Sequence, residues 1–429
     1  MSLNAKTLLN YEKMDLLRFS TAGSVDDGKS TLIGRLLYDS KGVFEDQLEA
    51  IRRTTEKKGG EDIDFALITD GLAAEREQGI TIDVAYRYFA TSKRKFIIGD
   101  TPGHEQYTRN MVTGASTADL AIILIDARNG VLIQSKRHGY IARLLGIPHI
   151  LVAVNKMDLV DFKQDVYEKI KNEYAAFFRK LSGETPGKSP ELTFIPISAL
   201  KGDNVTVKSK ATPWYGGKSL LDHLETVQIS KDRNMEDFRF PVQLVLRPNL
   251  DYRGFSGKVA SGRARKGKQI VILPSGNTAK IKSIDTFDQG DLEDAFPPMC
   301  VTLRLSEEVD ISRGDMLAYP DNQPRCDKNF SAHLCWMVKE PLALKKKYVL
   351  KLATGEVKAV VDSISWVRDM KTLEKNSASQ LDLNDIGLVS LQTLKPICFD
   401  PYARNRVTGS FILIDELNNN TVAAGMIVE

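Results

Sequence analysis

The residues with the clearest chemistry in this chain stand in one short segment near the N-terminus. They match the pattern G-x-x-x-x-G-K-[ST] and are Gly23, Ser24, Val25, Asp26, Asp27, Gly28, Lys29, Ser30 and Thr31. Glycines let backbone N–H groups close around phosphate oxygens, and the N-terminus of a following helix adds favourable partial charge. Lys29 contributes a full positive charge, and the Ser30 hydroxyl is a suitable ligand for Mg²⁺. The segment therefore predicts a site for a nucleoside triphosphate.

Three further segments, each at the end of an apolar run, indicate which nucleotide binds. In Asp100-Thr101-Pro102-Gly103 the aspartate can hold Mg²⁺ through water, and the glycine lets a backbone N–H reach the γ-phosphate; read alone, this segment is also a common turn. In Asn155-Lys156-Met157-Asp158 the final carboxylate can accept hydrogen bonds from guanine N1–H and the N2 amine, which adenine lacks. Ser198-Ala199-Leu200 would meet the base oxygen with a backbone N–H. Such a site should bind guanine nucleotides about 10⁴-fold or more tightly than adenine nucleotides. GTP and GDP are therefore the expected ligands.

Two single residues could turn binding into switching and hydrolysis. Thr81 lies between the phosphate loop and Asp100, where its hydroxyl could reach Mg²⁺ while the γ-phosphate is present. The alternative is an ordinary threonine on a strand edge. His104 follows Gly103, where a residue that orients the attacking water is needed. A purely structural histidine is the alternative there.

The elements that must position these segments follow from the periodicity of apolar residues. Apolar residues at spacings of three and four after Lys29 indicate a helix, and short apolar runs between helical patterns indicate strands. The strand candidates are 16–22, 95–99, 120–126, 150–154 and 194–197. Strands that alternate with helices predict a mostly parallel sheet covered on both faces.

The remainder of the chain has a different pattern. After residue 230, short runs rich in valine and isoleucine are separated by Gly, Pro and Asp, which predicts β-barrels. We interpret 324–328 as a second joint. The expected fold class is an α/β P-loop GTPase domain followed by two β-barrel domains, with domains at 1–230, 231–326 and 327–429.

Composition limits the function classes. The 59 basic and 56 acidic side chains give a net charge of +3, so no large positive field favours nucleic acid as the main ligand. The four cysteines, Cys300, Cys326, Cys335 and Cys398, form no C-x-x-C pair and are interpreted as reduced, mostly buried thiols. No apolar stretch approaches the roughly 20 residues of a membrane span, so no membrane role and a cytoplasmic location are expected.

With these motifs in place, the chain resembles the translation-factor class of GTPases and, within it, the regulatory GTPase subunits of bacterial sulfate adenylyltransferase. The resemblance is densest in 23–31, 70–88 and 100–111. Asp83 to Tyr88 and the pair Asp26-Asp27, where elongation factor Tu has Asp-His, look like the sulfate-activating branch. The resemblance implies a G domain followed by two β-barrels, in agreement with the pattern of apolar runs.

The resemblance also implies roles for individual residues. Lys29 would contact the β- and γ-phosphates, Ser30 and Thr81 would ligate Mg²⁺, and Asp100 would act behind a water. Asn155, Lys156 and Asp158 would select guanine. His104 would orient the hydrolytic water, gated by the apolar pair Val25 and Ile80. Asp26 would help bind a monovalent cation.

The partner implied by the resemblance is a separate, ATP-using catalytic subunit that makes adenosine 5′-phosphosulfate and pyrophosphate from ATP and sulfate. GTP hydrolysis on the present chain would drive that unfavourable reaction. An adenylylsulfate kinase is expected as a separate protein, because barrel-like sequence continues to Glu429. Two other functions remain open at this point: an elongation-factor-like GTPase that delivers aminoacyl-tRNA, and a nucleotide-gated scaffold with negligible turnover.

Overall fold

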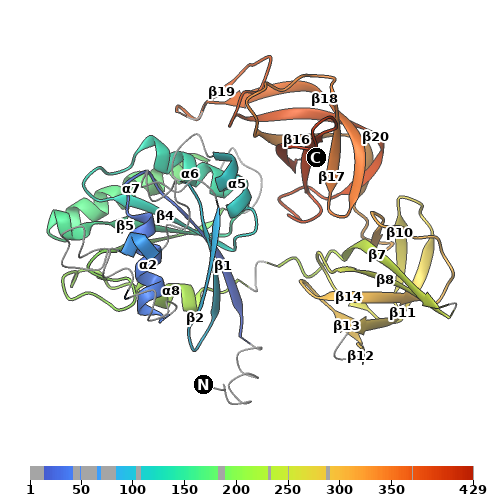
Figure 1. Cartoon of the computed structure of the whole chain (residues 1–429), viewed down its shortest axis with the longest axis horizontal. Helices are drawn as coiled ribbons and strands as arrows, with labels where there is room; N and C mark the ends of the chain where they lie inside the picture. The colour runs from blue at the N-terminus through green and yellow to red at the C-terminus, as the bar shows by residue number, and fades with distance from the viewer. Residues whose placement is uncertain are drawn as a thin grey trace. The chain divides into compact units, whose positions relative to one another are not determined.

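The computed structural model describes residues 14–41, 49, 65–68, 84–102, 108–181, 189–229, 233–249, 251–286, 290–369 and 371–428. The chain divides into two compact units, residues 1–229 and 230–429 (Figure 1). No helix within the described ranges is long and apolar enough to cross a membrane.

A mostly parallel sheet forms the centre of the first unit. In the described part of the chain its strands run in the order β2-β3-β1-β4-β5-β6, and β2 is antiparallel to β3 while the other neighbours are parallel. The strands are β1 (Leu16–Ala22), β2 (Ala85–Ala90), β3 (Lys95–Asp100), β4 (Leu120–Asp126), β5 (His149–Asn155) and β6 (Glu191–Pro196). The helices are α2 (Lys29–Asp39), α5 (Thr108–Ala115), α6 (Ile133–Leu144), α7 (Gln164–Leu181) and α8 (Leu220–Thr226), with 3-10 turns η1 (Phe65–Ile68) and η3 (Met157–Val160).

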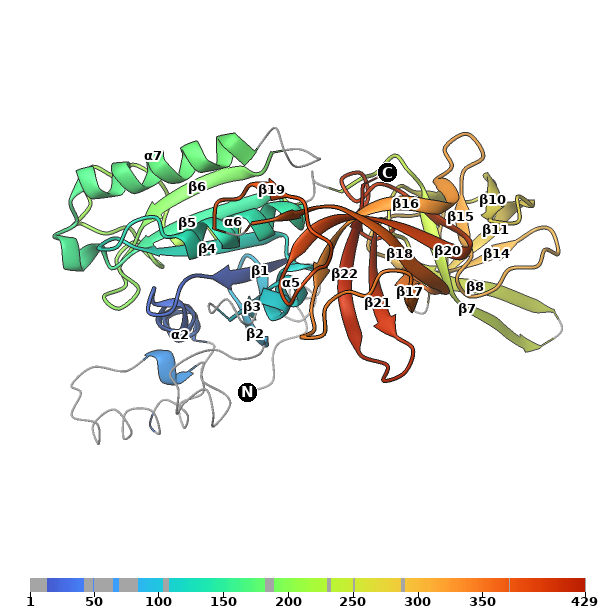
Figure 2. The same ribbon diagram turned by 90° about the horizontal axis from the view of Figure 1, so that it is seen from above.

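Helices cover this sheet on both faces, as the strand–helix alternation predicts. Figure 2 shows α2 on one face and α6 and α7 on the other. Leu32, Ile33 and Leu36 of α2 pack into a core with alternate residues of β1, β3 and β4. Every residue of β4 and β5 is buried, which is typical of central parallel strands. The carboxyl ends of the parallel strands therefore meet at one edge of the sheet.

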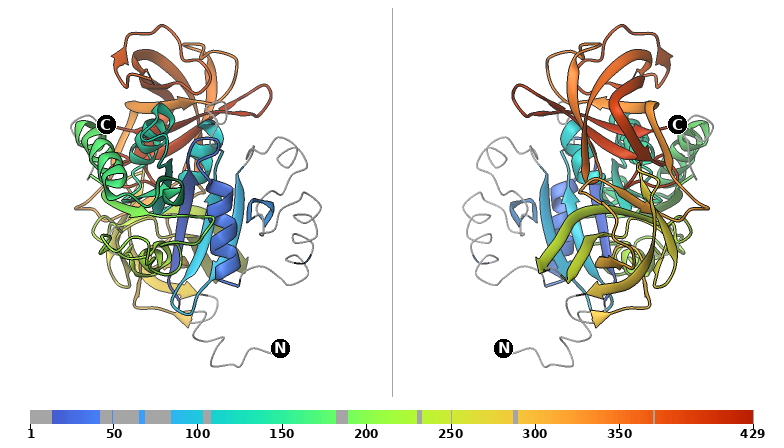
Figure 3. Two further views of the ribbon diagram at one scale, coloured as in Figure 1. Left: turned by 90° about the vertical axis from the view of Figure 1, so that its left-hand side faces the viewer. Right: turned by 90° about the vertical axis from the view of Figure 1, so that its right-hand side faces the viewer.

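The second unit contains two closed β-barrels. Among its described residues, the second sheet runs β10-β15-β7-β8-β14-β11-β12 and closes through β10–β11. The third runs β17-β21-β22-β16-β20-β18-β19 and closes through β17–β18; its strands are orange and red in Figure 3. The second-sheet strands are β7 (Arg239–Asn249), β8 (Tyr252–Lys258), β10 (Gln269–Leu273), β11 (Thr278–Thr286), β12 (Gly290–Asp291), β14 (Cys300–Leu305) and β15 (Met316–Ala318), with β9 (Ala264–Arg265) and β13 (Asp294–Ala295) paired separately. The third-sheet strands are β16 (Arg325–Trp336), β17 (Lys347–Leu352), β18 (Gly355–Arg368), β19 (Lys375–Asn376), β20 (Ile386–Phe399), β21 (Ser410–Asp415) and β22 (Thr421–Ile427).

A buried ion pair joins the two barrels within this unit. Arg239 of β7 donates from Nε and Nη2 to the two carboxylate oxygens of Asp400, both at 2.9 Å, and the two side chains are 0% and 3% exposed. Thr408 donates to the same carboxylate, and Asn322 accepts from Arg239. A second pair, Asp237 with Arg404, lies nearby, and the hydrogen bond from that guanidinium lowers the pKa of Asp237. These pairs connect residues about 160 positions apart in sequence, so neither is visible as a motif.

The fold class predicted from the sequence is confirmed, and several details differ. The segment 324–328 is not a joint, because β16 begins at Arg325. The proposed domain boundary after residue 326 therefore falls two residues inside that strand. The strand predicted at 194–197 begins earlier, at Glu191, and ends at Pro196. The strands predicted for the first unit also lack β2, an edge strand with polar and aromatic side chains on both faces.

The interpretation of the cysteines as reduced and mostly buried is wrong for two of them. Cys326 of β16 and Cys398 of β20 form a disulfide, with Cα atoms 4.1 Å apart. They are directly opposite each other in the antiparallel pairing of these strands. A separation of 72 residues hides that register from sequence inspection. Cys300 is a free exposed thiol, and Cys335 is free and buried.

Arg239→Met is expected to destabilise the second unit strongly, because it leaves the Asp400 carboxylate buried without its cation. We expect a loss of about 3–5 kcal/mol in the free energy of unfolding, measured by urea denaturation. Lys266→Met, which removes a solvent-exposed pair with Asp291, is the matched control and should change little. Equal effects of the two substitutions would contradict the assignment.

The stability of the third sheet is expected to fall in acid because of His333. Burial lowers its pKa to about 4 from 6.5, helped by the positive charges of Arg368 and Lys375. As the pH falls below 6.5, the unfolded chain takes up a proton that the folded chain does not bind until near pH 4. Stability should therefore drop by about 2 kcal/mol between pH 7.5 and 5, and His333→Gln should lose that part of the pH dependence. Urea unfolding followed by tryptophan fluorescence measures it, and an unchanged profile in the variant would refute the assignment.

Candidate functional site

The phosphate-loop segment lies between β1 and α2, as its pattern requires. Gly28 precedes the helix with φ of 89°, a left-handed conformation that glycine adopts without steric cost. A Cβ placed there would lie 2.4 Å from Asn155 Nδ2, so no larger residue fits. Asp26 also has a positive φ, 68°, which costs a non-glycine residue on the order of 1 kcal/mol. Two residues of this loop, Asp26 and Gly28, therefore have left-handed backbone conformations.

Lys29 begins α2 and its ammonium group lies inside the site. Lys29 is 8% exposed, donates to the Thr101 carbonyl at 2.5 Å and lies 3.5 Å from Asp100 Oδ1. Asp100 ends β3, where Thr21 Oγ1 donates to the same oxygen at 3.3 Å. The carboxylate and the Ser30 hydroxyl are hard oxygen donors, which fit Mg²⁺. The structure therefore places the predicted phosphate and magnesium groups of β1, α2 and β3 together.

Asn155 connects the phosphate loop to the segment after β6. It ends β5 and is buried; its Nδ2 donates to the Asp27 carbonyl at 2.8 Å, and its Oδ1 accepts from the Ala199 N–H at 2.9 Å. Its side chain therefore uses both ends of the amide within the protein. Three predicted segments that are far apart in sequence meet at this one residue.

The other residues predicted to select guanine lie around the same strand ends. Asp158 is in η3, and its carboxylate is 4.0 Å from Lys201 Nζ. Ser198 is buried and its Oγ accepts from the Lys201 N–H at 3.2 Å. Leu200 is 55% exposed, and its carbonyl accepts from Arg35.

Thr81, Gly103 and His104 lie outside the described residues, as does Ile80. Val25, the other member of the proposed apolar gate, is 44% exposed at the tip of the loop. Ser24 and Asp26 of the loop are half-buried and exposed respectively, and Ser30 and Thr31 are half-buried in the first turn of α2.

The sequence reading did not single out a group of charged side chains beneath the loop. Asp126 ends β4, is 2% exposed, and pairs with Arg128 at 2.7 Å and with Lys156 at 3.1 Å. Burial raises the pKa of Asp126, but hydrogen bonds from Arg128 and Lys156 outweigh it, and the net pKa is below the ordinary value. The sequence does contain a signal for this group, because Asp126 is the one carboxylate in an otherwise apolar strand and stands at its end.

Asp27 is a second buried carboxyl in this region. Its Oδ2 accepts from the Ser24 N–H at 2.6 Å. Burial raises the pKa of Asp27 to about 6; the Ser24 hydrogen bond opposes this shift, and the charge of Asp126 adds to it.

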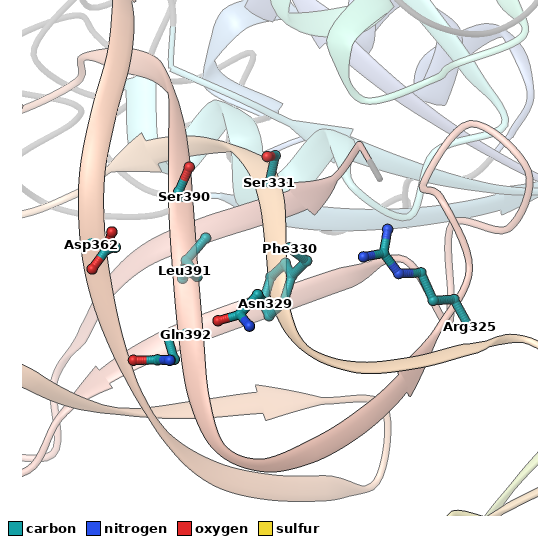
Figure 4. Close-up of a pocket in the computed structure, with 8 residues that line it drawn as sticks. All are labelled: Arg325, Asn329, Phe330, Ser331, Asp362, Ser390, Leu391 and Gln392. Atoms are coloured by element: carbon teal, nitrogen blue, oxygen red, sulfur yellow. The ribbon is translucent and has the colours of Figure 1, made fainter.

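A concavity of about 430 Å³ lies in the third sheet, within the second unit (Figure 4). Its lining residues come from β16, β18 and β20 and are Arg325, Asn329, Phe330, Ser331, Asp362, Ser390, Leu391 and Gln392. Arg325 and Asp362 lie at opposite ends of the labelled set, and each is paired, with Asp327 and Lys345 respectively. The concavity is therefore polar without a strong net charge.

Comparison with known proteins agrees with this geometry. The family model described as "Elongation factor Tu GTP binding domain" matches residues 14–234, and the one described as "GTP-eEF1A C-terminal domain-like" matches residues 329–428. A Bacteroides fragilis protein named sulfate adenylyltransferase subunit 1 is 58% identical, over 100% of this chain and 89% of its own length. Proteins of the same name from Bacteroides thetaiotaomicron and Alteromonas mediterranea are 57% and 56% identical, over 100% and 98% of this chain and 89% and 88% of their own lengths.

Asn155→Ala is expected to weaken GDP binding about tenfold to a hundredfold, because the Asp27 carbonyl and the Ala199 N–H would both lose their partner. Tyr174→Phe is the matched control: it removes one buried hydrogen bond, to the Ser135 carbonyl, between α6 and α7 of the same unit. The control should lower thermal stability while GDP affinity is unchanged, as measured by isothermal titration calorimetry. If Asn155→Ala binds GDP as tightly as the parent chain, the bridging role is wrong.

Proposed function

Because this chain belongs to the sulfate adenylyltransferase subunit 1 family, within the elongation factor Tu type of GTPase, we propose that it is the GTP-hydrolysing regulatory subunit of an ATP sulfurylase. The observation that carries the nucleotide part is the junction at Asn155, which holds the phosphate loop against the predicted guanine segment. The sulfate part rests on relatives that match the chain along its whole length.

In this proposal GTP binds across the carboxyl edge of the first sheet. Backbone N–H groups of residues 23–28 and the Lys29 ammonium hold the phosphates, while Asp158 and the backbone after β6 recognise the base. Asp26 contributes to a monovalent cation site beside the phosphates. Lys29 would exchange its hydrogen bond to the Thr101 carbonyl for the phosphate oxygens.

Ser30, Thr81 and Asp100 would hold Mg²⁺. When bound, the ion neutralises charge that develops on the phosphate oxygens during hydrolysis. The hydrogen bond from Thr21 Oγ1 to Asp100 Oδ1 and the Lys29 ammonium 3.5 Å away support this role for Asp100.

His104 is assigned the role of orienting the attacking water. Its neighbours Asp100 and Thr101 are buried at the end of β3, so the chain enters this segment from a fixed position. Orientation of a water matters more in the transition state than in the ground state.

The partner in this proposal is a separate catalytic subunit that forms adenosine 5′-phosphosulfate and pyrophosphate from ATP and sulfate. Energy from GTP hydrolysis on this chain drives that reaction. A separate kinase would then phosphorylate the adenylylsulfate.

A coupled assay tests this function directly. The full chain is mixed with its cognate catalytic subunit, ATP and sulfate, and adenylylsulfate is followed with GTP, without GTP, and with a non-hydrolysable GTP analogue. Synthesis should depend on hydrolysable GTP and should be lost with a Lys29→Ala chain. Synthesis that is independent of GTP would refute the coupling, and a GTP-dependent tRNA complex would favour the elongation-factor alternative.

His104→Ala is expected to reduce kcat for GTP hydrolysis by about 10² or more while GTP affinity changes little. His223→Ala, which alters a partly buried histidine on α8 of the same unit, is the control and should retain turnover. Steady-state phosphate release in the full complex gives kcat, and a filter-binding assay gives affinity. An unchanged hydrolysis rate in His104→Ala would show that His104 does not orient the water, and would favour the nucleotide-gated scaffold.

A further inference from the structure

The charged group beneath the phosphate loop contains one residue, Asp126, that has no place in the motifs of the nucleotide site. Its carboxylate is buried at the end of β4 and contacts two cations, Arg128 at 2.7 Å and Lys156 at 3.1 Å. Of these, Arg128 is half-exposed and Lys156 reaches the phosphate loop.

We propose that Asp126 is a positioning residue that holds Lys156 against the phosphate loop and thereby sets the residence time of the bound guanine nucleotide. The inference rests on the nucleotide site proposed above. It concerns a side chain that is assigned neither to the phosphates nor to the base in that proposal.

The backbone of Lys156 shows why it needs to be held. Lys156 has φ of 60°, in the left-handed region that a residue with a Cβ rarely adopts. Its Nζ donates to the carbonyl of Asp26, which is also left-handed, with φ of 68°. A four-carbon flexible side chain gains this one contact at the cost of rotamer entropy. The ion pair with Asp126 fixes the ammonium from the other side and so supports the contact.

Asp126 lies between the strand that leads into the phosphate loop and the strand that ends at Asn155. Its strand β4 pairs with β1, which leads into the phosphate loop, and with β5, where Asp126 is directly opposite Asn155. Lys156 is the next residue after Asn155. Release of Lys156 would therefore loosen the loop at Asp26, next to the Asp27 carbonyl that Asn155 holds.

The direction in which neutralisation of Asp126 changes nucleotide affinity tests the inference, because simple electrostatics and the positioning role predict opposite directions. Asp126 is a negative charge near a site for phosphates, so its neutralisation alone would favour nucleotide binding. The positioning role predicts that Asp126→Asn weakens binding, because Lys156 loses its anchor. The two accounts cannot both describe the same measurement.

The experiment measures release of a fluorescent GDP from the full chain by stopped flow. Asp126→Asn should release GDP about tenfold to a hundredfold faster, the range for loss of a charged hydrogen bond. Lys156→Met should be similarly fast, and the double variant should be no faster than Lys156→Met alone. Arg128→Gln, which touches the same carboxylate from the solvent side, is the matched control and should change release less than about threefold.

Two further variants distinguish failure of the Asp126 inference from a folding defect and from failure of the proposed nucleotide site. Unchanged or slower release from folded Asp126→Asn would overturn the inference, as would additive effects with Lys156→Met. If Asp126→Asn does not fold, Asp126→Glu is measured in its place, because its longer side chain keeps the charge and displaces Lys156. Unchanged GDP release from Asp126→Glu would also overturn the inference. Asp158→Asn should weaken GTP and relax base choice, and failure of that variant would refute the nucleotide site itself, whatever Asp126 does.

Discussion

The side-chain amide of Asn155 is the interaction on which the candidate site depends. It donates to the phosphate loop at the Asp27 carbonyl and accepts from the segment after β6 at Ala199. Asn155 can do both because it ends β5, whose seven residues are all buried between covered faces of the sheet. Fixed in this way, one amide sets the distance between the phosphate loop and the segment after β6 that is predicted to read the base. The glycine at position 28 leaves the room that this amide needs.

The two units bring distant residues together in different ways. In the first, the carboxyl ends of parallel strands bring separate loops to one edge, so the binding groups converge without forming a continuous segment. In the second, two closed barrels bury their own cores and are joined by the Arg239–Asp400 pair. A buried ion pair of this kind contributes geometry more than stability, because desolvation offsets much of its attraction. We therefore regard it as a connection that fixes how the two barrels meet within their unit.

Much of the fold was accessible from sequence because its signals are local. The strands β1 and β4 coincide with the predicted runs 16–22 and 120–126, and the phosphate loop follows β1 as its pattern requires. What sequence could not provide depends on pairing between distant residues. The opposition of Cys326 and Cys398 needs the β16–β20 register, and the group around Asp126 needs β4 beside β5. The edge strand β2 was missed because its two faces are not clearly apolar and polar. The roles of Thr81 and His104 remain predictions from their spacing and from the resemblance.

The most direct measurement of the central claim, a guanine-reading site at this sheet edge, is the affinity of the full chain for GDP and for ADP. Both are obtained by displacement of a fluorescent GDP under identical magnesium and salt concentrations. A site whose buried polar groups pair with guanine N1–H and the N2 amine should bind GDP at least about 10⁴-fold more tightly than ADP. Comparable affinities for the two nucleotides would contradict the account.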